Sequence, residues 1–300
     1  MAALTSNTIA STYTGLLKTS DSGARGAEGS ADQCSDGGGN TIPLFVSATE
    51  VYAVGSGAGT SHTAFGKDSG VDLSTGTGNA LFGEGSGADL TTGEHNVSVG
   101  YHALYQGTTE TDDNVAIGYN AMSGGWTTAA VNDCVVIGSG AGAGALVAGA
   151  SGSTVVGTAA GAAMTSAERS TAVGYKALNL LTTGNDNTAI GYEAALGNTA
   201  GGAGAIDHYS TTAVGAYAGT AIESGSSNTF IGMNSGKANT DGYRNTFVGV
   251  DSGLSTTLGS LNVIIGALAG DLLTTSGNNV LVGVSAGTAI AAGQTTTDGT

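Results

Sequence analysis

The chain has 300 residues, of which 54 are Gly, one is Pro and 5% are aromatic, so a thick core of large side chains is excluded. Its formal net charge is −16 with only seven Lys and Arg, which disfavours binding to nucleic acid or to an anionic membrane surface. Hydrophobic residues make up 40% of the chain, too many for a solvated disordered tract. These proportions predict a narrow core that repeats along the chain.

Residues 1–50 differ in composition from the rest of the chain. They contain the only Pro, Pro43, and a Gly-, Ser- and Asp-rich stretch over residues 20–39 that predicts a linker or a long loop. The first 20 residues lack the pattern of a secretion signal, and no stretch of about 18 apolar residues predicts a transmembrane helix. We assign residues 1–50 to attachment or to trimer initiation.

Residues 51–287 form a tandem repeat. A Gly that follows two mostly apolar residues recurs, usually at intervals of 17 residues, with longer intervals of 18, 20, 19 and 24 residues. The third residue after this Gly is Ala or Ser in every copy. Representative cores are Asn187–Gly191 (NTAIG) and Asn228–Gly232 (NTFIG). The repeated glycines are Gly55, Gly66, Gly83, Gly100, Gly118, Gly138, Gly157, Gly174, Gly191, Gly215, Gly232, Gly249, Gly266 and Gly283.

Each core predicts a strand of about four residues between two turn residues. One such strand cannot bury its apolar face alone, but the same strand from successive copies can stack. The sequence therefore predicts an all-β fold, a parallel β-solenoid or β-roll of about fourteen 17-residue coils. At roughly 4.8 Å per coil the rod would be about 65 Å long. The Asn that opens many copies is expected to form a hydrogen-bonded stack along the rod.

The two residues before each Gly are mostly apolar and point to opposite faces of the strand. One face can fill the coil, and the other needs cover from a second sheet or a second chain. We interpret the small residue after each Gly as a point where two backbones approach closely. Together these features predict self-association, with a single chain whose two sheets press together as the alternative.

The repeat cores resemble the head repeats of trimeric autotransporter adhesins, in which three chains form a left-handed parallel β-roll. The segments Ser170–Leu178 (STAVGYKAL) and Asn187–Ala194 (NTAIGYEA) are also similar to arrays in phage tail-fibre-like proteins. Near the N-terminus, Thr5–Leu17 and Asp36–Ser47 resemble the opening of fibre-like virion proteins of marine phages. The stalk and membrane anchor of an autotransporter do not appear in these residues.

This resemblance implies a structural virion fibre or appendage of a phage, a homotrimer that projects from the particle and contacts the host surface. Residues 1–50 would bind other virion proteins, and host-surface glycans are a further candidate partner. The alternative is a bacterial surface adhesin or an extracellular filament subunit. An ice-binding solenoid is a third possibility, weakened because Thr lies three places before the Gly in only half of the copies.

No catalytic, cofactor-binding or metal-binding residue is predicted, and we do not expect an enzyme. The four histidines are dispersed, and no base repeatedly accompanies a Ser. Insertions in a solenoid project as side loops, so the two longest intervals supply candidate surface recognition residues. These candidates are Trp126, His208 and Tyr209, although an aromatic that covers a coil edge is the ordinary alternative. Residues 288–300 are expected to be a polar C-terminal tail.

Overall fold

The computed structural model describes residues 62–106, 111–125, 130–144, 151–198 and 206–288, and the backbone of three strands nearer the N-terminus. Those three strands, β1 (Lys18–Thr19), β2 (Asp32–Ser35) and β3 (Thr41–Val46), form an antiparallel sheet in the order β1-β2-β3. The described residues contain no helix.

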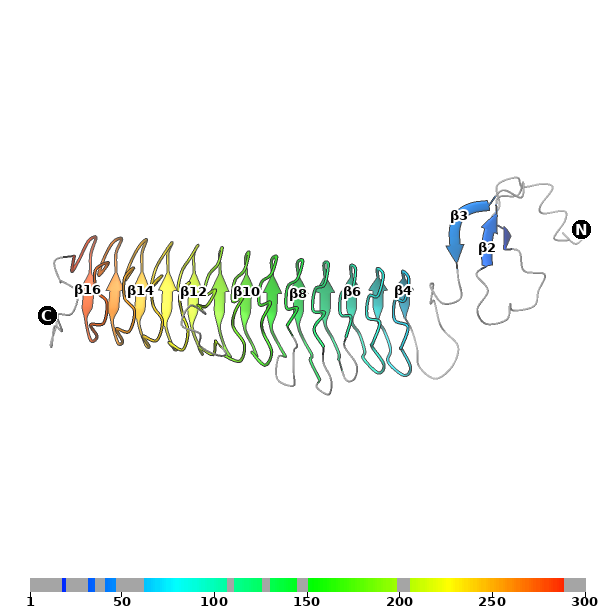
Figure 1. The fold of residues 1–300 in the computed structure, drawn as a ribbon, viewed down its shortest axis with the longest axis horizontal. Coiled ribbons are helices and arrows are strands. Elements are labelled where there is room, and N and C mark those ends of the chain that lie inside the picture. Colours follow the sequence, from blue (N-terminus) through cyan, green and yellow to red (C-terminus); the bar gives the residue numbers. More distant parts are fainter. Residues whose placement is uncertain are drawn as a thin grey trace, which may run out of the picture.

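The remaining thirteen strands form one parallel sheet in which each strand pairs with the strand of the next coil (Figure 1). This confirms the predicted all-β solenoid with coils of about 17 residues. The first predicted copy, which ends at Gly55, lies outside the described residues. The strands are β4 (Thr63–Phe65), β5 (Ala80–Phe82), β6 (Val97–Val99), β7 (Val115–Ile117), β8 (Val135–Ile137), β9 (Thr154–Val156), β10 (Thr171–Val173), β11 (Thr188–Ile190), β12 (Thr212–Val214), β13 (Thr229–Ile231), β14 (Thr246–Val248), β15 (Val263–Ile265) and β16 (Val280–Val282).

Each strand has three residues, one fewer than predicted, because the Gly that follows it leaves the β region. Gly174, for example, has φ +134°, a conformation that side chains rarely adopt. A Cβ atom on Gly174 would also overlap the carbonyl group of Gly191 in the next coil. The repeated Gly is therefore required both by the turn and by the close stacking of successive coils.

The register is the same between all neighbouring coils, whatever their length. Thr171 pairs with Thr188 across a 17-residue interval, and Thr188 pairs with Thr212 across the 24-residue interval. An isolated bridge between Leu181 and Ile206 aligns the backbone again before β12 begins. The added residues of the long coils are therefore accommodated outside the sheet.

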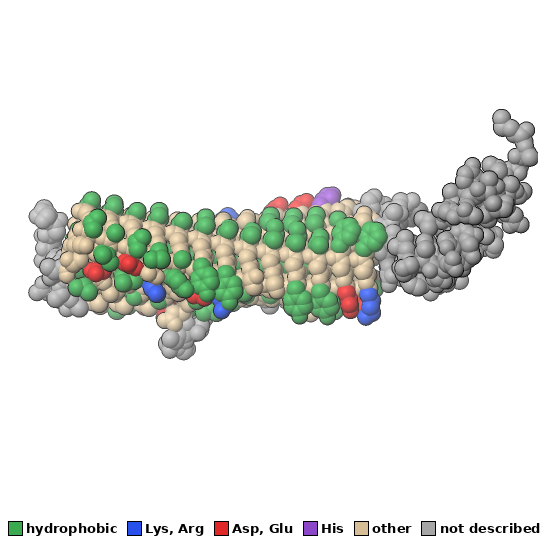
Figure 2. Space-filling view, turned by 90° about the horizontal axis from the view of Figure 1, so that it is seen from above, with side chains coloured by type: hydrophobic (Ala, Val, Ile, Leu, Met, Phe, Trp, Pro, Cys, Tyr) green, Lys and Arg blue, Asp and Glu red, His purple; other side chains and the backbone are tan. Residues whose placement is uncertain are grey.

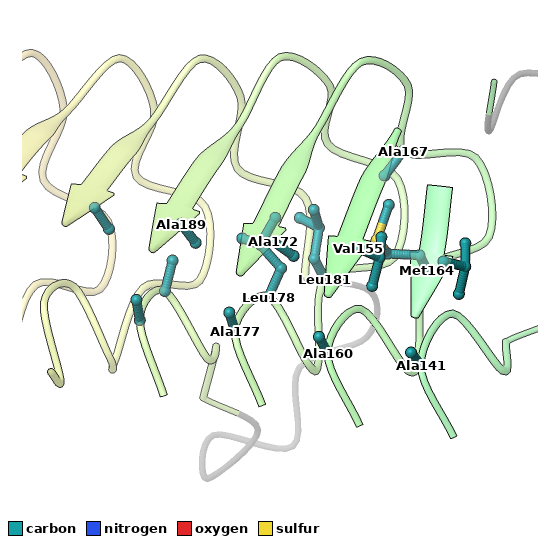
Figure 3. Packing of buried hydrophobic residues seen from close by; sticks show 14 of the residues in the cluster. Ala141, Val155, Ala160, Met164, Ala167, Ala172, Ala177, Leu178, Leu181 and Ala189 are labelled. Carbon is teal, nitrogen blue, oxygen red and sulfur yellow. The ribbon is translucent and has the colours of Figure 1, made fainter. Parts of the chain in front are cut away.

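The middle residue of each strand points into the coil. Figure 3 shows Val155, Ala172 and Ala189 on successive strands, with Leu178 and Leu181 entering the same interior from the segments that follow a strand. In the coils of β4–β15 the small residue three places after the Gly, such as Ala177, is also buried. This corrects the expectation that the small residue marks an approach between chains, because it packs inside its own coil.

Large and small side chains alternate within the interior. Phe230 and Phe247, the middle residues of β13 and β14, are fully buried, and Gly236 and Gly253 follow four places after the repeated Gly of those coils. In the coil of β10 the arrangement is reversed, because Ala172 is the middle residue and Leu178 takes the later position. The coil of β10 thus fills its interior from the turn, and those of β13 and β14 fill it from the strand. The coil of β12 has the small residues Ala213 and Gly219 at both positions, and the ring of Phe230 from the next coil packs against Gly219.

The predicted stack of Asn side chains is present and buried. The side-chain Oδ1 of Asn228 accepts a hydrogen bond of 2.9 Å from the backbone N–H of Asn245. Asn245 repeats this arrangement with Asn262, at 3.0 Å, and its Nδ2 donates to the carbonyl of Gly259 at 2.8 Å. These bonds join each coil to the next inside the rod, where water cannot replace them.

Candidate functional surfaces

The most extensive surface feature is the outward side of the sheet, formed by the first and third residues of strands β4–β16. We call it the outer face. None of these thirteen strands contains a charged residue, although the chain holds 23 Asp and Glu. Its large apolar residues are substantially exposed, as shown by Phe65 at 45%, Ile190 at 40% and Val282 at 67%. Figure 2 shows a row of hydrophobic side chains that follows one edge of the rod along its length.

The sequence could not decide which apolar residue fills the coil, and the structure resolves this. The third strand residue, usually Val or Ile, faces outward, and the middle residue, which varies from Ala to Phe, faces inward. The β-branched side chains of Val, Ile and Thr have restricted χ1 angles, so the outer face is a stiff array of methyl and hydroxyl groups. Such a surface can pack against another regular surface but holds no group suited to acid, base or nucleophilic chemistry.

A run of Thr occupies the first position of six consecutive strands on the outer face. The strand register places Thr154 beside Thr171 and continues unbroken to Thr246. Ala or Val stands at this position in β5–β8 and in β15–β16, so over the thirteen strands the Thr row is interrupted, as the presence of Thr in only half of the copies predicts. A Val or Ile row runs beside the Thr row at the third position of the same strands.

Charged residues occupy the turns rather than the outer face. Arg169 lies in the turn before β10 and donates hydrogen bonds to Asp186 in the next coil at 2.7 and 3.0 Å. These bonds lower the pKa of Asp186 below its ordinary value, with the positive charge of Arg169 adding to the effect. Both side chains are exposed, so the contact ties neighbouring turns without forming a shielded site.

Aromatic side chains form two exposed stacks in the turns after the strands. Tyr101 and Tyr119 stack at a centroid distance of 5.5 Å, and Tyr175 and Tyr192 at 5.1 Å. The rings lie nearly parallel in successive coils, so each covers a face of its neighbour and reinforces the coil stacking. We assign them a structural role.

The three predicted recognition residues have different outcomes. Trp126 lies outside the described residues. Tyr209 is 43% exposed, so the side chain is accessible at the surface. His208 is fully buried, and the expectation that it lies on a surface loop is wrong.

His208 is buried because it belongs to the coil interior. Its Nδ1 lies 3.1 Å from Oδ1 of Asn187, and burial lowers its pKa to about 4. Its coil has Thr211 where other coils have the stacked Asn, and His208, three places earlier, fills the space that the larger amide would occupy. Two other coils also have a residue other than Asn at this position, combined with a buried residue three places earlier. These combinations are Cys134 with Val131 and Ser170 with Ala167. This pattern is the signal in the sequence that could have placed His208 inside.

Within the described ranges, no group of three or more His, Cys, Asp or Glu side chains is arranged to hold a metal ion. That part of the chain also has no helix of the length and hydrophobicity needed to cross a membrane. Cys134 is buried in the coil interior, which raises the pKa of its thiol.

The sequence matches no protein-family model, and no curated protein or solved structure is detectably similar to it.

Proposed function

We propose that the chain is a structural rod, the shaft of a virion fibre or appendage of a phage. The observation that carries this proposal is the unbroken register of thirteen parallel strands. Each coil is joined to the next by strand hydrogen bonds and by side-chain bonds such as that between Asn228 and Asn245. A rod built in this way resists bending and holds its two ends about 58 Å apart along the sheet.

Three further features support a mechanical role. The strands of the outer face hold no charged residue and the coil interior is mostly apolar, so these surfaces serve packing. The ionisable side chains are dispersed among the turns. The negative charge of −16 keeps such a rod soluble despite its exposed apolar rows. The resemblance of residues 5–17 and 36–47 to the openings of fibre-like virion proteins suggests that the N-terminal region attaches to the particle.

The location of the protein tests this proposal. Antibodies against the purified chain, used for gold labelling in electron microscopy, should mark appendages on purified phage particles. Mass spectrometry of the same particles should detect the chain. Label on the surface or on filaments of bacterial cells would overturn the virion assignment and support the adhesin or filament alternative. Label confined to the cell interior would overturn both.

Ice binding is the second candidate, favoured by one specific observation. The six consecutive Thr residues from Thr154 to Thr246 form a regular row with a spacing of about 4.8 Å. A rigid, uncharged and evenly spaced array of hydroxyl and methyl groups can order water. If this function applies, the purified chain produces thermal hysteresis that is lost in Thr212→Lys and retained in Thr182→Lys, which lies outside the sheet. Absence of hysteresis in the unmodified chain eliminates it.

A further inference from the structure

We propose that the outer face is an interface between copies of this chain, which lie parallel and in register. This inference rests on the proposed function, since it describes how several copies would form one fibre shaft.

The outer face is large enough to hold two chains together. Thirteen strands at about 4.8 Å spacing extend about 58 Å, and a three-residue strand spans about 10 Å. Each copy would therefore cover about 600 Å² of its partner, and two copies would bury roughly 1,200 Å² in total, the lower end of the range for specific interfaces. The third strand position contributes an apolar row that runs unbroken over all thirteen strands of this face, and an exposed apolar surface of this extent marks an interaction site.

The distribution of charge indicates a partner whose surface is equally uncharged. The chain has 23 Asp and Glu, but none lies on β4–β16. Depletion of charge is typical of the centre of protein interfaces. An acidic or basic partner would find no complementary group on this face, whereas a second copy supplies a surface of the same length, flatness and strand spacing.

The sizes of the side chains favour parallel copies. When two copies are related by a two-fold axis along the rod, their strands run in opposite directions across the interface. The third residue of a strand then lies near the first residue of the same coil in the other copy. In β5 the third residue is the bulky Phe82 and the first residue is Ala80, the only Ala at that position among the thirteen strands. The largest and the smallest side chains of the face therefore meet.

Antiparallel copies would lose this match. With an axis along the strands, β5 would face β15, so Phe82 would lie over Ile265 and Ala80 over Val263. Two large side chains would then meet at Phe82, and a gap would remain at Ala80. The parallel arrangement avoids both the overlap and the gap, and it also brings like ends of the rods together, as a fibre attached at one end requires.

Light scattering on the full chain tests the association. The expected native mass is a small integer multiple, two or more, of 28.7 kDa. Val214→Lys places a charge in the middle of the face and should reduce the mass to that of one chain. Met233→Lys, at an exposed apolar residue outside the strands, should leave the mass unchanged. A stable monomer of the unmodified chain overturns the interface, and equal effects of the two substitutions overturn its location.

A cross-linking experiment tests the orientation. Val282→Cys, made with Cys34→Ser, places one thiol on the outer face at the end of the rod. A short bismaleimide should join these thiols between parallel copies, because their β16 strands lie together. An oligomeric mass without cross-linked product overturns the parallel arrangement. Neither result depends on where the protein is found, so failure here is distinguishable from failure of the virion assignment.

Discussion

At the scale of single residues, the coil interior is a fixed volume that each copy fills in its own way. Phe247 fills it from the strand and requires Gly253, whereas Leu178 fills it from the turn and requires Ala172. The middle strand position can therefore vary from Ala to Phe without a change in coil size. This explains how a chain with 5% aromatic residues buries two Phe side chains in neighbouring coils.

Gly253→Ala should destabilise the protein by more than its backbone conformation alone explains. Gly253 has φ +59°, and an added Cβ would lie 2.5 Å from ring atoms of Phe247. Gly140 has a similar φ of +64° with nothing within 4 Å of an added Cβ, so Gly140→Ala reports the backbone cost alone. We expect Gly253→Ala to lower the free energy of unfolding by about 1–3 kcal/mol more than Gly140→Ala, measured by urea denaturation. Equal effects would contradict the packing account.

The burial of His208 predicts a stability that falls in acid. Burial lowers its pKa from 6.5 to about 4, so the folded state binds the proton less readily than the unfolded state. The contribution is fully present above pH 6.5 and is lost as the pH falls from 6.5 towards 4, by about 3 kcal/mol in total. His208→Gln should flatten the unfolding free energy over this range, and His95→Gln, at an exposed position, should not. An unchanged pH profile in His208→Gln would show that His208 is accessible to water.

At the scale of the element, strands such as β14 are held by backbone pairing on both sides and by the buried Asn that precedes them. Asn245 satisfies the backbone N–H of Asn262 and the carbonyl of Gly259 in the following coil. No water reaches these groups, since Asn245 and Asn262 are at most 1% exposed. Removal of one amide therefore leaves polar groups of the next coil without a partner.

Asn245→Ala should lower the free energy of unfolding by about 2–5 kcal/mol, because each buried group left unpaired costs about 1–3 kcal/mol. Asn179→Ala is the matched control. Its Nδ2 donates to the carbonyl of Ala159 at 2.7 Å in the neighbouring coil, but the Asn179 side chain is only half-buried. We expect a loss under about 1 kcal/mol for the control. Chemical denaturation monitored by circular dichroism would compare the two, and similar losses would argue against a special role for the buried stack.

The sequence predicts the strands well because the repeated Gly marks their ends and the Asn marks their starts. It does not predict which side of the strand is buried, since both residues before the repeated Gly are mostly apolar. Ala189 and Ile190, which precede Gly191, are an example. The interior side is identified only when the size of the middle strand residue is compared with the residue four places after the repeated Gly. A large middle residue occurs with Gly at that later position, and a small one can occur with Leu. The position of His208 also escapes a count of spacings, because the bridge between Leu181 and Ile206 restores the register within a long coil.

At the scale of the whole molecule, stability and shape both come from contacts between neighbouring coils. The coil of β10 touches those of β9 and β11, and no described strand pairs beyond its neighbours. The length of the rod therefore depends on the number of coils, not on the number of residues. The 18-, 19-, 20- and 24-residue intervals add mass at the side and leave the axial rise unchanged.

Distances between spin labels test this claim most directly. One label at Thr158 is paired with a second at Met233, Val250 or Ala267, all in the turns after strands, and labelled chains are diluted with unlabelled ones. The stacked coils predict separations of four, five and six coils, about 19, 24 and 29 Å, although all three pairs span the 24-residue interval. Separations that do not increase in equal steps would contradict a solenoid of stacked coils.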